Sequence, residues 1–159
     1  MPKLSQGDIF ESIEKSRDSL AVVFGHIGFN LMSQYWKAFS ARHPQVEMIR
    51  SPFNGLPNIP VQLSNNRWLW FIQGETNHGM TDERLLSNLE MAFSWASRQH
   101  IRFVVTNGIA DTDHDKDTAH NRQSDERRAR FLVDYARGVE EKHDIRIELV
   151  SLNDIFVRS

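Results

Sequence analysis

Acidic and histidine side chains crowd into one short stretch of the sequence, directly after an apolar run at residues 101–105 and the dipeptide Asn107-Gly108. The stretch holds six groups able to transfer protons or ligate a metal: Asp111, Asp113, His114, Asp115, Asp117 and His120. Carboxylates and imidazoles are the usual side chains for either task. Their spacing matches neither the calcium-binding loop nor the His-Glu-x-x-His zinc motif, so we predict no metal site. The alternative is a solvated loop in which aspartates form turns.

A second candidate stretch, residues 25–30, reads Gly-His-Ile-Gly-Phe-Asn and follows the apolar run at residues 20–24. Glycines allow a backbone to approach a ligand closely, and free N–H groups at the start of a following helix favour phosphate. The spacing is neither the dinucleotide-binding fingerprint nor a Walker loop. A phosphate cradle and a plain tight turn therefore both remain open from these residues alone.

Two further sets of residues are interpreted as structural. The aromatic residues fall on predicted strands and on one helix face, where a hydrophobic core is favoured over a slot for a base: Trp68, Trp70, Phe71, Phe93, Trp95 and Phe103. Four arginines lie beside Asp125 and Glu126, which favours an exposed, salt-bridged helix start over a phosphate clamp: Arg122, Arg127, Arg128 and Arg130.

The composition excludes several classes of protein. The chain has 159 residues, 40% of them hydrophobic, which is enough for one domain with a real core and predicts a single domain over residues 1–159. A net charge of −2 argues against a nucleic-acid partner. The absence of cysteine excludes disulfides and thiolate zinc sites. Because no apolar run approaches the roughly 20 residues of a membrane-spanning helix, and the N-terminus has no signal-peptide pattern, we expect a cytoplasmic protein without a membrane partner.

The hydrophobic periodicity predicts alternating strands and helices. Expected strands cover residues 4–10, 20–24, 60–63, 67–73, 101–106 and 145–150, the last near a sheet edge with one wet face. Expected helices cover residues 31–43, 81–99 and a final segment that begins at an N-cap on Ser124, with a surface turn or short helix at 11–19. This order predicts an α/β domain with a mostly parallel central sheet flanked by helices.

Taken together, these segments resemble the macro domain family. Residues 6–10 (Gln-Gly-Asp-Ile-Phe) resemble the opening strand of the family, which ends in Gly-Asp-Ile. Residues 22–46 resemble its next strand, loop and helix, and residues 68–73 its central strand. Residues 81–96 and 101–110 resemble its long helix and the strand that enters a second phosphate loop.

The resemblance implies a three-layer macro-like fold, a mixed but mostly parallel sheet, and a site for ADP-ribose or a related nucleotide. In it, Asp8 would contact the adenine and Ile9 would make a backbone contact. The two phosphate loops would supply the other ligand-binding residues: Gly25, His26, Gly28, Asn107, Gly108, Ile109 and Ala110.

The chain also departs from the family pattern. The asparagine near the distal ribose is replaced by Ile27, and the Met-Gly-x-Gly turn reads Met-Ser-Gln-Tyr at residues 32–35. Asp111 replaces a glycine of the second loop.

Three hypotheses follow from the sequence. The first is nucleotide binding without a cofactor. The second is hydrolysis of an ADP-ribose derivative, as a glycohydrolase or a phosphatase of the terminal phosphate, with polar and acid–base groups from four residues: Asn30, Asp111, Asp113 and His114. The third is an interaction or sequestration module that has lost the pocket and binds a protein partner.

Overall fold

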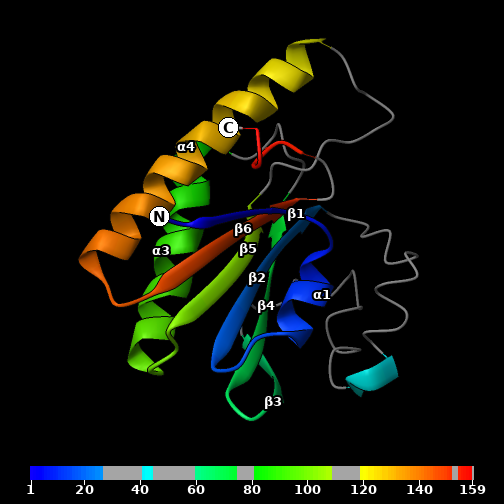
Figure 1. Ribbon diagram of the computed structural model, residues 1–159, viewed down its shortest axis with the longest axis vertical. Coiled ribbons are helices and arrows are strands. Elements are labelled where there is room, and N and C mark those ends of the chain that lie inside the picture. The colour runs from blue at the N-terminus through cyan, green and yellow to red at the C-terminus, as the bar shows by residue number, and fades with distance from the viewer. Residues whose placement is uncertain (27–40, 45–59, 75–80, 109–118, 152–153, 159) are drawn as a thin grey trace.

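The computed structural model describes residues 1–26, 41–44, 60–74, 81–108, 119–151 and 154–158. The elements in chain order are β1 (Lys3–Gln6), α1 (Ile9–Glu14), β2 (Ser19–His26), β3 (Pro60–Ser64), β4 (Arg67–Gly74), α3 (Asp82–Arg98), β5 (Phe103–Gly108), α4 (Ala119–Lys142) and β6 (Arg146–Ser151) (Figure 1).

The strands form one six-stranded sheet in the order β1-β6-β5-β2-β4-β3. Every neighbouring pair is parallel except β3 with β4, which is antiparallel. The expected single α/β domain with a mixed, mostly parallel sheet is therefore confirmed. No helix in the described part of the chain is both long and apolar enough to cross a membrane.

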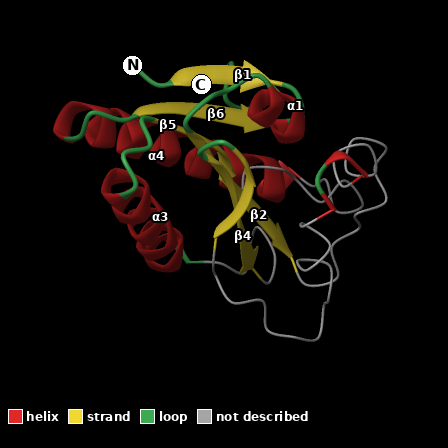
Figure 2. Cartoon of the chain, turned by 90° about the horizontal axis from the view of Figure 1, so that it is seen from below, coloured by secondary structure: helices red, strands yellow, loops and turns green. Residues whose placement is uncertain are grey.

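Helices cover both faces of this sheet (Figure 2). On one face α3 and α4 pack against alternate residues of the central strands, such as Leu20, Val22 and Val104. On the other face Ile9 and Ile13 of α1 join the residues that point the opposite way, such as Ala21. The central strands are buried on both sides, which explains their continuous apolar runs.

Helix α3 forms as its sequence predicts. Thr81 is the N-cap, and its Oγ1 accepts a hydrogen bond from the N–H of Arg84 at 3.2 Å. The predicted apolar face is the buried one: Leu85, Leu89, Ala92, Phe93 and Ala96. Because an α-helix has about 3.6 residues per turn, residues spaced three and four apart lie on one face, and this face packs against the sheet.

Several boundaries, and the exposure of one strand, differ from the predictions. The first strand ends at Gln6, and Ile9 and Phe10 belong to α1, because Asp8 caps that helix. Residues 25–26 extend β2, and residues 107–108 extend β5, so neither pair starts a loop. Helix α4 begins at Ala119, ahead of Ser124. Strand β6 is also buried on both faces after Arg146, Glu148 included, and β1 rather than β6 forms the outer strand of the sheet.

One carboxylate joins three parts of the fold. Glu14, at the end of α1, accepts hydrogen bonds from Arg42 at 3.2 and 3.3 Å and lies 3.0 Å from Nε2 of His43. Its second oxygen accepts a bond from Arg67 of β4 at 3.3 Å. Burial by itself raises the pKa of Glu14, but the hydrogen bonds and charges of His43 and Arg42 outweigh it and lower that pKa below its ordinary 4.5.

We expect the Glu14→Gln variant to lose about 1–2 kcal/mol of stability at pH 7, because the cations lose their counter-charge. A carboxylate with a lowered pKa stabilises the folded state above its unfolded pKa, and this stabilisation disappears as the pH falls through the folded pKa. The stability difference between wild type and variant should therefore shrink below pH 4.5. Urea unfolding between pH 7 and 3 measures it, with Glu11→Gln on the same helix as control; a constant difference at all pH values would contradict the assignment.

Candidate functional site

The parallel strands place the predicted site residues along one side of the sheet, where the carboxyl ends of the strands meet; we call this side the carboxyl edge. Strands β1, β6, β5, β2 and β4 all end there, and Asp8 follows β1 while Gly25 and His26 end β2. Strands β2 and β5 are neighbours, with Val23 paired to Gly108. After β2 the chain continues toward β4 and β3, whereas after β5 it crosses to β6 on the other side. Open α/β sheets commonly bind ligands at the carboxyl ends of two strands between which the direction reverses in this way.

A β-bulge shapes the end of β5. Val22 pairs with Thr106 and Val23 with Gly108, so Asn107 is the extra residue on β5. Its side chain takes over the pairing that its backbone has lost. Oδ1 of Asn107 accepts a hydrogen bond from the N–H of Phe24 at 2.9 Å, and Nδ2 donates one to the carbonyl oxygen of Phe24 at 3.2 Å. The sequence predicted Asn107 as a ligand-binding residue. In the structure, both polar atoms of its side chain form hydrogen bonds that join β5 to β2.

Gly108, the last residue of the bulge, needs to be a glycine. Its φ is +56°, in the left-handed region that side chains rarely adopt. A Cβ at this position would lie 2.5 Å from Cδ1 of Leu132, a buried core residue of α4. The N–H of Gly108 donates to Oγ1 of Thr106 at 3.0 Å. The backbone of β5 therefore passes directly against α4 as it leaves the sheet.

Asp8 is held at the end of β1. The N–H of Gly7 donates to the carbonyl oxygen of Ser151 in β6 at 2.8 Å, which ties this turn to the sheet edge. Oδ1 of Asp8 accepts a hydrogen bond from the N–H of Phe10 at 2.8 Å and caps α1. Burial raises the pKa of Asp8, and the capping bond offsets only part of that effect. A half-buried carboxylate with a raised pKa is common at binding sites. The side chain of Ile9 lies in the core.

The remaining predicted residues lie outside the described part of the chain: Gly28, Asn30, Ile109, Ala110, Asp111, Asp113 and His114. All four predicted catalytic residues are among them, so their placement is not described and hydrolysis remains a prediction from sequence. Within the described ranges there is no group of three or more histidine, aspartate or glutamate residues able to hold a metal ion.

The interpretation of the aromatic residues as core is confirmed for the described side chains, and that of the arginines holds only in part. Trp95 of α3 lies edge-on to Trp68 and Trp70 of β4, with ring centroids 5.1 and 5.8 Å away, and all three belong to or pack against the core. Arg127 and Arg128 of α4 lie 3.0 and 3.1 Å from the carboxylate of Asp82. These ion pairs join α4 to the first turn of α3, so the two arginines are structural, as predicted. The predicted exposed helix start is wrong, because α4 begins at Ala119 and Arg128 is buried.

Sequence reasoning missed a polar hollow of about 420 Å³ between α1 and the β1–β6 edge. Asp8 lies at one end, and the buried carboxylate of Glu148 forms part of its wall. Oγ of Ser5 donates to Oε2 of Glu148 at 3.3 Å, and Nζ of Lys3 lies 3.9 Å from the same oxygen. The one signal in the sequence was a glutamate within the apolar pattern of β6, which the alternation had suggested was solvent-exposed.

The fold is an open α/β domain in which the chain reverses direction between β2 and β5. Comparison with protein-family models, with curated proteins and with solved structures finds no match to this chain.

Proposed function

We propose that this protein binds ADP-ribose or a related nucleotide across the carboxyl edge of its sheet. The observation that carries the proposal is the change of direction between β2 and β5, because open α/β sheets commonly bind ligands at such a point and the two segments that the sequence suggested as phosphate loops begin there. The resemblance of residues 6–10 to the Gly-Asp-Ile segment of macro domains supports a role for Asp8 at the same edge.

The spacing of these features favours an extended ligand. Strands in a sheet lie about 4.8 Å apart, so Asp8 after β1 lies about 10 Å from the end of β5 and about 14 Å from the end of β2. A lone base or a mononucleotide does not reach from Asp8 to both strand ends. A ligand with a base at one end and two phosphates further along does, which favours a nucleoside diphosphate derivative over AMP.

Two substitutions at Asp8 separate binding from helix capping. We expect Asp8→Asn to keep the cap, because asparagine is an equally good N-cap residue, and to leave the thermal midpoint close to that of wild type. Its carbonyl oxygen would be used by the N–H of Phe10, as Oδ1 is now, and the NH₂ group would face the ligand where an acceptor stood. We expect ADP-ribose affinity to fall about tenfold or more, the effect of losing a hydrogen bond to a charged group.

Asp8→Ala should weaken ADP-ribose binding as well, and also destabilise the fold by about 1 kcal/mol through loss of the cap. Calorimetric titration of both variants with ADP-ribose, beside thermal unfolding, measures both effects. Glu141→Ala, at an exposed position of α4 far from the carboxyl ends of the strands, is the control for loss of a carboxylate. Wild-type affinity in Asp8→Asn, in a protein that does bind ADP-ribose, would show that the base does not lie at Asp8.

A further inference from the structure

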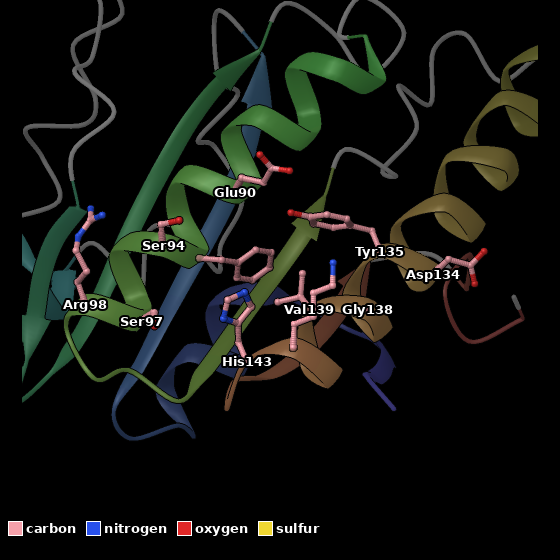
Figure 3. A pocket seen from close by; sticks show the side chains of 11 residues that line it. Glu90, Ser94, Ser97, Arg98, Asp134, Tyr135, Gly138, Val139 and His143 are labelled. Atoms are coloured by element: carbon pink, nitrogen blue, oxygen red, sulfur yellow. The ribbon is translucent and has the colours of Figure 1, made fainter.

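A second hollow, of about 580 Å³, lies between the C-terminal halves of α3 and α4 (Figure 3). Helix α3 ends just before β5 begins, and α4 ends just before β6 begins, so this groove lies toward the amino edge of the sheet. The candidate nucleotide site is at the opposite edge. The two sites are therefore distinct, and neither the sequence motifs nor the proposed function uses the groove.

Aromatic and aliphatic side chains form the base of the groove. Phe93 of α3 and Tyr135 of α4 line the groove, and their ring centroids lie 6.2 Å apart with planes inclined by 42°. Val139 lies one helical turn beyond Tyr135. Next to it, a Cβ added to Gly138 would meet no heavy atom within 4 Å. The glycine thus leaves open space beside two aromatic rings, and a planar group fits such a space.

The two ends of the groove carry opposite charge. Glu90 and the hydroxyl of Tyr135 lie at one end; burial and the charge of Glu90 raise the pKa of Tyr135 to about 12, so the hydroxyl stays a hydrogen-bond donor. His143 lies opposite them (Figure 3), and Lys142, its neighbour at the end of α4, also lines the groove. Basic residues favour the C-terminus of a helix in any case, so their presence alone indicates no ligand. Both residues line the groove, and neither side chain forms a hydrogen bond or an ion pair with the described residues. They are therefore available to bind an anionic ligand.

We propose that this groove binds a small planar aromatic anion, with its ring against Phe93 and Tyr135 over Gly138 and its acidic group at Lys142 and His143. The volume lies within the usual range of small-molecule sites, and the pattern of an apolar base with a few polar groups at the ends is typical of them.

The probe for the test is 8-anilinonaphthalene-1-sulfonate, an aromatic sulfonate whose fluorescence rises on binding. We expect saturable binding to the wild-type protein. Gly138→Leu places a side chain in the open space, and Lys142→Glu reverses the charge at the basic end. Each should raise the Kd of the probe about fivefold or more, while Arg130→Glu, an exposed arginine on α4 outside the groove, should change it by less than about twofold. Circular dichroism checks that each variant is folded.

An NMR titration with the same probe locates the site. We expect the Gly138 amide to shift and the Gly108 amide to stay unchanged, and we expect ADP-ribose not to displace the probe. Equal affinity in all three variants, displacement of the probe by ADP-ribose, or no saturable binding would each overturn the proposal. Because Lys142 is exposed, its charge reversal keeps the test valid even if Gly138→Leu does not fold.

Discussion

Gly108→Val is expected to lower the free energy of unfolding by about 2–5 kcal/mol, the largest loss that we predict for a single substitution. About 1–2 kcal/mol comes from forcing a side chain into the left-handed backbone region at φ +56°. A further 1–3 kcal/mol, roughly, comes from overpacking, because the new Cβ would lie 2.5 Å from Cδ1 of Leu132 in the core. Urea unfolding at neutral pH measures the loss.

The matched control is Gly138→Ala. This glycine lies inside α4 and its φ is not positive. A Cβ at this position would project into open space. The alanine should leave stability unchanged or raise it by about 0.5–1 kcal/mol, because glycine is unfavourable inside a helix. Similar stability of the two variants would show that Gly108 is not constrained as described.

Asn107→Ala is expected to lower the free energy of unfolding by about 2–3 kcal/mol, because it leaves both the N–H and the carbonyl oxygen of Phe24 without the partners that the side chain of Asn107 supplies.

Asn107→Asp tests the same geometry in another way. It keeps an acceptor for the N–H of Phe24 but places a carboxylate oxygen against the carbonyl oxygen, so it should also destabilise the fold at pH 7. Its loss of stability should become smaller in acid, when the carboxyl group is protonated and can donate a hydrogen bond to that carbonyl oxygen.

Denaturant unfolding of both variants, at pH 7 and at pH 4, gives these values. A change of less than about 0.5 kcal/mol in Asn107→Ala would mean that the side chain does not replace backbone pairing at the bulge. Because the bulge directs the chain out of β5, we also expect weaker nucleotide binding in Asn107→Ala than in wild type.

The sequence predicted the elements of this fold better than their ends. Continuous apolar runs identified β2, β4 and β5, and the spacing of Leu85, Leu89, Ala92, Phe93 and Ala96 identified the buried face of α3. These signals arise from burial, which sequence patterns report directly. The ends of β1 and β5 were misplaced because they depend on single interactions. One is the capping bond of Asp8, and the other is the side chain of Asn107 acting as backbone.

The candidate site divides in the same way. That polar residues would follow β2 and β5 could be read from the sequence, and the parallel sheet brings these two strand ends together. The distance of Asp8 from them depends on β6 lying between β1 and β5, and no local pattern encodes that order. The groove between α3 and α4 could not be predicted from the sequence either, because its residues come from two helices that are far apart in the chain.

The most direct test of nucleotide binding is an NMR titration of the ¹⁵N-labelled protein with ADP-ribose, with AMP, NAD and cyclic nucleotides run beside it. We expect saturable binding of ADP-ribose in the micromolar range, stronger than that of AMP, with the largest shifts at the amides of Gly7, Asp8, Gly25, His26 and Gly108 at the carboxyl edge. No shift with any member of the panel would contradict the proposal and favour a module that keeps the fold for a protein partner. Shifts confined to the groove between α3 and α4 would place the nucleotide site there and contradict the assignment to the sheet edge.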